Sequence, residues 1–135
     1  MIHLDTNVAI ALLNNRQPNV RARFDAALAA TPLAMSTVVY HELMFGAANS
    51  AHRQANEDKV AIFIAAGAIA LLALAEDDAR EAADISAHLK RQGTPIGPYD
   101  VLIAAQARRS GATLVTANPG EFERVPGLVV VNWAG

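Results

Sequence analysis

Short apolar segments alternate with longer segments of helical periodicity, and this alternation limits the fold of the chain more than any other feature. The short segments, which we expect to be strands, cover residues 2–5, 33–36, 69–74, 113–116 and 128–132. The expected helices begin near residue 8, cover 19–30 and 37–48, follow Arg53, and cover 77–92 and 99–110. Strands separated by helices are joined by right-handed crossovers, which build a mainly parallel sheet with helices on both faces. The sequence therefore predicts an α/β fold around a mainly parallel five-stranded sheet.

Two residues are expected to mark helix ends. Thr37 lies between an expected strand and an expected helix, where a hydroxyl side chain can cap the first turn. Gly111 follows the helix over 99–110, in the usual position for a glycine that ends a helix.

Length and composition favour one domain over residues 1–135. The chain is 53% hydrophobic and 18% charged, so it can bury a core and is not expected to be disordered. The uncharged run 60–75 has 16 residues and is interrupted by Gly67. A membrane span needs about 20 residues, so we interpret this run as a helix end, a turn and a core strand. The apolar segment 128–132 likewise predicts a strand buried on both faces.

Charge and cysteine content narrow the function. The net charge of −2 gives no strongly basic surface for nucleic acid, but if three carboxylates bind a cation the remaining charges are 11 positive and 10 negative. The absence of cysteine excludes disulfides, thiolate zinc sites and cysteine nucleophiles. The N-terminus lacks the pattern of a signal peptide, and we expect a cytoplasmic protein. The histidines show no metal-binding spacing and are expected to be structural or exposed: His3, His41, His52 and His88.

Oxygen-bearing side chains fall near the ends of three expected strands, where open parallel sheets bind ligands. Asp5 ends the first strand, Glu42 lies in the second turn of the helix after the second strand, and Asn118 follows the fourth strand. Asp100 opens the helix that leads into the fourth strand. We expect such a helix to begin at the opposite rim unless its start is offset, so topology supports Asp100 least.

Each of these residues also has a purely structural interpretation. Asp5 can cap the next helix, and Asp100 can stabilise its own first turn. Glu42 can be a surface residue, although Val38, Val39 and Phe45 share its face. Asn118 can be a turn residue before a Pro-Gly pair. Together, however, three converging acids would repel one another unless a hard cation such as Mg²⁺ or Mn²⁺ joined them.

Four segments in order along nearly the whole chain resemble one family. They are "LDTNV", "STVVYHELMFGA", "GTPIGPYDVLIAAQA" and "LVTANPGEFERVPGLVVVNW". The sequence resembles the PIN-domain ribonucleases, and within them the VapC toxins of bacterial toxin–antitoxin pairs. The resemblance implies a three-layer α/β/α sandwich and an acidic cluster that binds Mg²⁺ or Mn²⁺.

The resemblance also implies roles for single residues. Asp5, Glu42 and Asp100 match the three catalytic and metal-binding acids, and Asn118 matches a fourth metal position that is often aspartate. This difference removes a charge and leaves open whether one or two metals bind. Pro119-Gly120 replaces a more polar or basic pair, so the RNA contact there is open as well. Thr6 and Thr116 match hydroxyl positions that orient ligands or water.

The implied activity is hydrolysis of RNA phosphodiester bonds, in which a water molecule oriented by Asp100 or Asp5 attacks phosphorus in line. Structured RNA such as tRNA or rRNA is the implied substrate, and arrest of translation is the implied result. A cognate antitoxin and a second copy of the chain are the implied protein partners, possibly in a higher assembly. The residues that bind RNA are unknown; the basic candidates are Arg16, Arg21, Arg23, Lys90, Arg91, Arg108 and Arg109.

Other classes fit less well. A haloacid-dehalogenase-type phosphatase needs an acid two residues after Asp5, where Asn7 stands. A receiver domain needs an acid at the end of the third strand, which ends in Leu72-Ala73-Leu74. A non-catalytic PIN-like binding module or scaffold is the main alternative.

Overall fold

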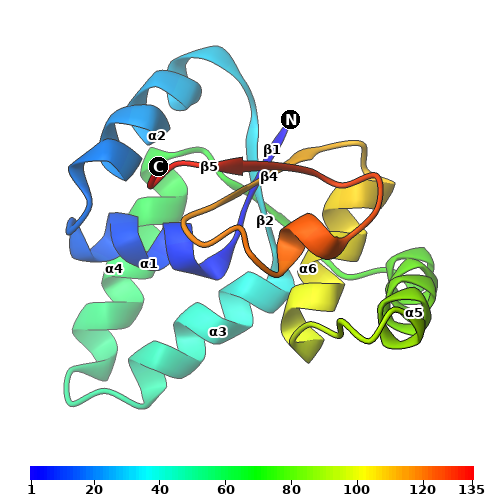
Figure 1. The fold of residues 1–135 in the computed structure, drawn as a ribbon. Helices are drawn as coiled ribbons and strands as arrows, with labels where there is room; N and C mark the ends of the chain where they lie inside the picture. The colour runs from blue at the N-terminus through cyan, green and yellow to red at the C-terminus, as the bar shows by residue number, and fades with distance from the viewer.

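A parallel sheet of five strands forms the centre of the computed structural model, which describes all 135 residues (Figure 1). The strands are β1 (Ile2–Leu4), β2 (Leu33–Ser36), β3 (Ala70–Leu72), β4 (Thr113–Thr116) and β5 (Val129–Asn132). Their order in the sheet is β3-β2-β1-β4-β5, and every neighbouring pair is parallel. The predicted α/β fold is therefore confirmed, with β1 as the central strand.

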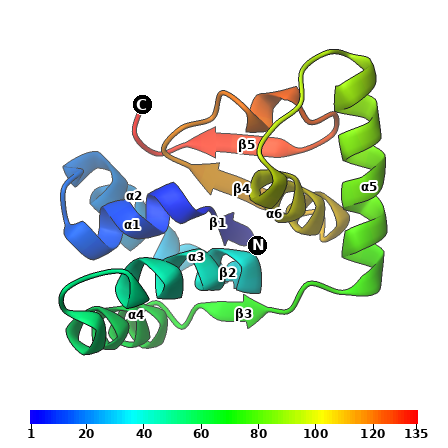
Figure 2. The same cartoon turned by 90° about the horizontal axis from the view of Figure 1, so that it is seen from below.

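Six α-helices cover the sheet in two groups. They are α1 (Thr6–Asn14), α2 (Pro18–Ala30), α3 (Thr37–Ala48), α4 (Arg53–Ala66), α5 (Glu76–Arg91) and α6 (Pro98–Arg109), and a short 3-10 helix, η1 (Phe122–Arg124), precedes β5. Helices α1 to α4 lie in the connections that lead from β1 to β2 and from β2 to β3, on one side of β1. Helices α5 and α6 lie in the connection from β3 to β4, which leads to the other side of β1. Right-handed crossovers in opposite directions place their helices on opposite faces. Figures 1 and 2 show α1, α2 and α4 on one side, with α5 and α6 on the other.

The core lies between the sheet and these helices. One cluster of 27 buried apolar residues includes Leu4, Met35 and Leu114 from the three inner strands. The run 60–75 divides, as predicted, into the end of α4, a turn at Gly67 and β3. No helix has the length and apolar character needed to cross a membrane.

Helix ends follow local side-chain chemistry. The Ser36 hydroxyl, and not that of Thr37, caps α3 by accepting from the Val38 N–H at 3.0 Å. The expected cap was wrong by one residue because Thr37 already has helical geometry. Gly111 follows α6 with a φ of +67°, a conformation that favours glycine, so its expected role is confirmed.

The outer strands differ from the prediction. β3 is an edge strand and not a core strand, and its Leu71 is 39% exposed. β5 forms the other edge, where Val129 and Val131 are exposed, so the expected burial on both faces is wrong. Apolar composition predicts a strand, but it does not say which strand lies at the edge.

Ion pairs join α5 to α6. The buried carboxylate of Asp78 accepts from the Ala75 N–H at 2.8 Å and from Arg109 Nε at 2.6 Å, and Arg108 Nε donates to Glu81 at 2.8 Å. Burial acts to raise the pKa of Asp78, but the Ala75 amide and Arg109 outweigh it and lower that pKa. Asp78 thus caps the first turn of α5 and also joins α5 to α6 through Arg109.

We expect Asp78→Ala to lower the free energy of unfolding by about 1–2 kcal/mol, because it removes a helix cap and a charged hydrogen bond. The partly exposed Arg109 keeps the ion-pair contribution small. Asp77→Ala is the matched control, because Asp77 is 69% exposed and 3.9 Å from Arg109; its effect should stay within about 0.5 kcal/mol. Urea unfolding of both variants measures the difference, and equal losses would contradict this role of Asp78.

Candidate functional site

Asp5 lies at the carboxyl end of the central strand and is 2% exposed. Its Oδ1 accepts from the Val8 N–H of α1 at 3.0 Å, and its Oδ2 accepts from the Thr116 hydroxyl of β4 at 2.7 Å. The cap predicted from sequence is therefore present, but it uses one oxygen only. The second oxygen accepts the hydrogen bond from β4. Asp5 can therefore cap α1 and also belong to a site, because the two interpretations are compatible.

Glu42 reaches the same rim from the second turn of α3. It is half-buried, and its Oε1 accepts from the Thr6 hydroxyl at 2.6 Å. Thr6 directly follows Asp5 in the chain. The hydrogen bond from Thr6 to Glu42 therefore joins Glu42 to the segment that carries Asp5. Thr6 and Thr116 thus contact Glu42 and Asp5, and their role in orienting ligands or water stays a prediction.

Asp100 lies in the first turn of α6, at the same rim as Asp5. The expectation that this helix begins at the opposite rim was wrong: a crossover helix runs antiparallel to the strands, so it starts where they end. Asp100 is hydrogen-bonded to Glu121, whose Oε2 also accepts from the Gly97 N–H at 3.4 Å. A Cβ added at Gly97 would lie 3.3 Å from Asp100 Oδ2, so glycine permits this close approach.

Glu121 is an acid of the site that the sequence analysis missed. It follows β4 by five residues and directly precedes η1. Only residues close to strand ends were considered, whereas the whole loop after β4 lies over the rim. Asn118 lines the same cavity of about 250 Å³ as Asp100 and Glu121, together with Asn7, Gly120, Phe122 and Arg124.

The clustered acids change one another's protonation. Burial, the hydrogen bond to Glu121 and the charges of Glu121, Glu42 and Asp5 raise the pKa of Asp100 to about 7. The bond from Asp100 lowers the pKa of Glu121, so Asp100 is the member of this pair that keeps the proton. Burial also raises the pKa of Asp5, with a smaller contribution from Glu42, although Thr116 and two backbone amides oppose it.

The donor set fits a hard divalent cation. The acids, Asn118 and the two threonines at the rim offer carboxylate, amide or hydroxyl oxygen, the ligands that Mg²⁺ and Mn²⁺ prefer. No three acidic or histidine side chains are close enough to enclose an ion as they stand. Mg²⁺ commonly binds through one or two carboxylates and several waters, so it needs no closed cage of protein atoms.

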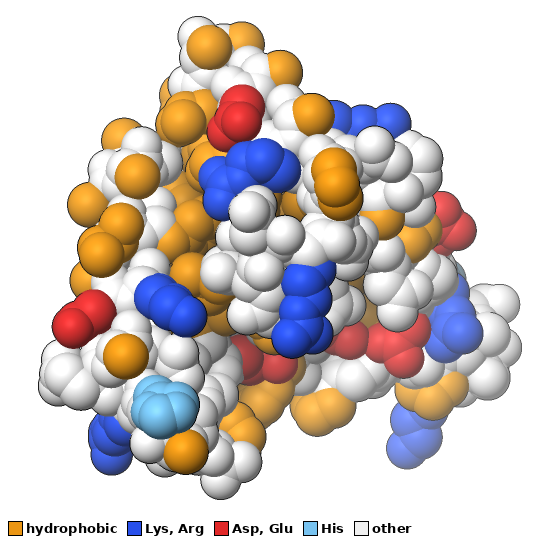
Figure 3. All heavy atoms as spheres, turned by 90° about the vertical axis from the view of Figure 1, so that its left-hand side faces the viewer, with side chains coloured by type: hydrophobic (Ala, Val, Ile, Leu, Met, Phe, Trp, Pro, Cys, Tyr) orange, Lys and Arg blue, Asp and Glu red, His pale blue; other side chains and the backbone are white.

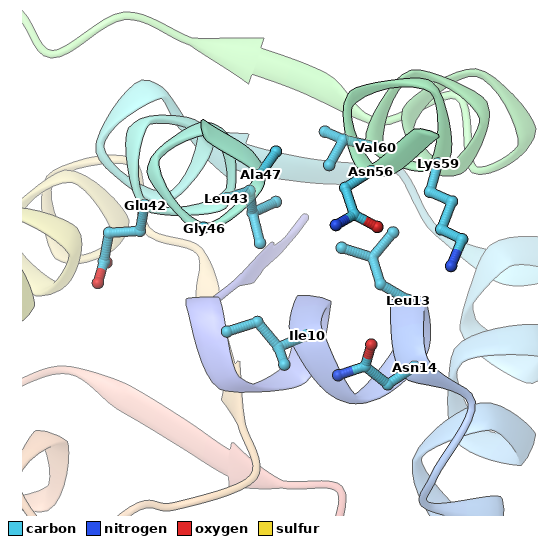
Figure 4. A pocket seen from close by; sticks show the side chains of 10 residues that line it. All are labelled: Ile10, Leu13, Asn14, Glu42, Leu43, Gly46, Ala47, Asn56, Lys59 and Val60. Carbon is cyan, nitrogen blue, oxygen red and sulfur yellow. The ribbon is translucent and has the colours of Figure 1, made fainter. Parts of the chain in front are cut away.

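A groove extends from Glu42 between α1 and the α3–α4 pair. Its first cavity, of about 250 Å³, contains Ile10, Leu13 and Val60, with Glu42 at one end and Lys59 at the other (Figure 4). A second cavity, of about 290 Å³, shares Leu13 and Lys59 and continues past Phe24, Ile62 and Phe63. We call these two cavities together the apolar groove.

Comparison with known proteins relates this chain to one family. A model of the PIN domain matches residues 2–128. The tRNA(fMet)-specific endonuclease VapC of Shigella flexneri is 37% identical over 134 residues, which are 97% of this chain and 96% of that protein. The protein of the same name from Salmonella typhimurium is 35% identical over 133 residues, 96% of each chain.

A solved structure shows the same fold. The crystal structure of VapBC2 from Rickettsia felis, bound to a DNA fragment from their promoter, matches with a TM-score of 0.91 and 29% identity. The match covers 98% of this chain and 99% of that one. The predicted three-layer PIN-like sandwich is therefore confirmed.

We expect the metal-free protein to lose stability as pH rises from about 4 to about 7. The raised pKa of Asp100 means that the folded state holds its proton more tightly than the unfolded state, and deprotonation removes that advantage. Asp100→Asn should reduce this loss, because only the raised pKa of Asp5 then remains, so its melting temperature should exceed that of the wild type by a margin that grows with pH.

Thermal melting in EDTA between pH 4.5 and 8 measures this margin. Asp84→Asn on α5 is the control, because it removes an exposed carboxylate outside the site. Parallel pH profiles for the wild type and Asp100→Asn would show that the acids do not repel one another.

Proposed function

This chain belongs to the PIN-domain family, in its VapC group, and on that basis we propose that it is a metal-dependent endoribonuclease that acts as a toxin. The observation that carries the proposal is the acid cluster of Asp5, Glu42, Asp100 and Glu121 at the carboxyl rim of the sheet. These carboxylates repel one another, so a bound divalent cation would lower the electrostatic energy of the cluster. The family resemblance implies that the reaction is hydrolysis of RNA phosphodiester bonds. Cleavage of structured RNA would then stop translation.

Asp5, Glu42 and Asp100 are the proposed catalytic and metal-binding acids, with Glu121 beside them. Asn118 stays the proposed fourth metal position, because it lines the cavity that holds Asp100 and Glu121. Mg²⁺ or Mn²⁺, when bound, would screen phosphate charge and lower the pKa of water. Asp5 is held as a fixed acceptor by Thr116, whereas Asp100 has a pKa near neutrality and is suited to accept a proton from attacking water.

The relatives from Shigella and Salmonella are named for tRNA(fMet), so that tRNA is the first substrate to test. We propose cytoplasmic action on RNA, consistent with the absence of a helix that could span a membrane. Similar toxins form homodimers, and a dimer of this chain stays a prediction that solution scattering can check.

A cognate antitoxin is the proposed protein partner, because the solved relative from Rickettsia felis is a VapBC complex. We place its inhibitory segment in the apolar groove, which begins at Glu42 and offers Ile62 with 67% of its surface exposed. A segment with apolar side chains and one charged group could fill the groove and reach the acids from there.

Purified protein should cleave tRNA in Mg²⁺ or Mn²⁺ and lose this activity in EDTA. Asp100→Asn should lower kcat by at least about 100-fold, since proton transfer and charge stabilisation each contribute effects of that size. Glu123→Gln, an exposed residue of η1 outside the site cavity, is the matched control and should keep its activity.

Two results would oppose the nuclease proposal. Cleavage that persists in EDTA and in Asp100→Asn would come from another site or another protein. A wild type that binds tRNA, rRNA and mRNA but cuts none would instead support the non-catalytic binding module.

Ile62→Glu should prevent inhibition by the co-expressed antitoxin while RNA cleavage stays unchanged, because Ile62 lies in the apolar groove and away from the acids. Val129→Glu is the control: Val129 is 58% exposed but lines neither cavity of the groove. Size-exclusion chromatography of the co-expressed pair measures complex formation. Normal complex formation by Ile62→Glu would place the antitoxin elsewhere.

A further inference from the structure

Two aromatic rings join the helices that carry Glu42 and Asp100. His41 directly precedes Glu42 on α3, and Tyr99 directly precedes Asp100 on α6. The Tyr99 hydroxyl oxygen lies 3.4 Å from His41 Nε2, within hydrogen-bonding distance. The ring centroids are 5.6 Å apart and the ring planes meet at 79°, which is the edge-on arrangement that aromatic pairs prefer.

The His41–Tyr99 pair is the one side-chain hydrogen bond between α3 and α6. These two helices contact each other, and Figure 2 shows them side by side. No ion pair joins them. Glu42 is bonded to Thr6 of α1, and Asp100 to Glu121 before η1, so neither acid bonds to the other helix. The spacing of α3 and α6 at the rim therefore depends on this pair and on packing.

No basic side chain offsets the repulsion between the acids through an ion pair. The ion pairs of the structure involve other carboxylates, namely Asp25, Glu57, Asp77, Asp78 and Glu81. Figure 3 shows acidic side chains gathered low on one face, with basic side chains above and beside them. Carboxylates that lie near one another repel, so the charges of Glu42 and Asp100 act to separate α3 from α6.

A cation bound by carboxylates of both helices needs α3 and α6 at a fixed spacing. Asp5 is already held by two hydrogen bonds from other elements. Glu42 and Asp100 are half-buried, so their positions depend more on the helices that carry them. A site whose elements are held in place before binding loses less conformational freedom when the ligand arrives.

We propose that His41 and Tyr99 are positioning residues that hold α3 and α6 at the spacing in which Glu42 and Asp100 bind one divalent cation. The inference rests on the proposed function. The two rings act through the neighbouring acids and contact neither the ion nor the RNA. Loss of the pair would let the helices separate and would weaken cation binding, while the RNA contacts stay as they are.

The exposure of the pair separates this role from a general structural one. Tyr99 is 46% exposed and His41 is exposed, so neither belongs to the apolar core. Replacing either residue by alanine should therefore change the melting temperature of the metal-free protein by no more than about 3 °C.

The test measures cation binding without RNA. Mn²⁺ is titrated into the purified metal-free protein, and the rise in melting temperature gives the half-saturating concentration. His41→Ala and Tyr99→Ala should each raise this concentration about three- to tenfold, the size expected for one edge-on aromatic pair. The double variant should resemble the single variants, because both residues act through one contact.

Two further variants sharpen the test. Tyr99→Phe keeps the ring and removes the hydroxyl, so its half-saturating concentration should lie between those of the wild type and Tyr99→Ala. Phe45→Ala is the matched control, because Phe45 is an aromatic residue of α3 that is 62% exposed and belongs to no aromatic pair. Equal effects of Phe45→Ala and His41→Ala would overturn the inference, and so would additive effects of His41→Ala and Tyr99→Ala.

Cleavage of tRNA distinguishes the positioning role from a contact with RNA. Tyr99→Ala should cut more slowly than the wild type in limiting Mn²⁺, and excess Mn²⁺ should restore kcat with an unchanged KM for tRNA. A KM that stays raised in excess Mn²⁺ would place the rings on the RNA and overturn the inference. If the wild type cuts no RNA while Mn²⁺ binding still depends on His41 and Tyr99, the proposed function fails and the positioning role stands.

Discussion

The hydrogen bonds of the buried Asp5 carboxylate fix the geometry on which the rest of the site depends. Asp5 ends the central strand, and its two oxygens join the first turn of α1 to β4. Its backbone N–H also donates to the Val115 carbonyl at 3.0 Å, which continues the β1–β4 ladder. A residue held from three directions cannot move far when a ligand binds. Rearrangement on binding must therefore come from Glu42 and Asp100, which are only half-buried.

Bringing carboxylates together works against the stability of the fold. The pKa of Asp100 is raised to about 7 and that of Glu121 is lowered, so near neutral pH this pair carries less than two full negative charges. Gly97 is the backbone position that lets this pair lie so close to the chain. An arrangement that is unfavourable when empty and favourable with a cation is typical of a functional site and not of a structural one.

The inner strands of the sheet could be predicted from the sequence, whereas the identity of the two edge strands could not. The strands at 33–36 and 113–116 have the expected bounds, because fully buried strands between clear turn signals are read from local pattern alone. The edge positions of β3 and β5 depend on strand order, which no local pattern contains. The rule for strand ends pointed to Asp5 and Glu42, whereas for Asp100 it predicted the wrong rim, and the family resemblance was what included Asp100. Glu121 was missed because its loop position becomes visible only when the chain folds back over the rim.

Helix α1 separates two surfaces of different chemistry, the apolar groove and a cavity lined by Asn7, Gln17 and Asn118, and only Ile10 and Asn14 line both. A protein segment lying in the apolar groove would approach the acids from the side of Glu42, while Asn7 and Asn118 stay open on the other side. Because that segment would reach Glu42, it would meet the RNA at the acids even though the two approach from opposite sides of α1. An excess of RNA would then weaken inhibition.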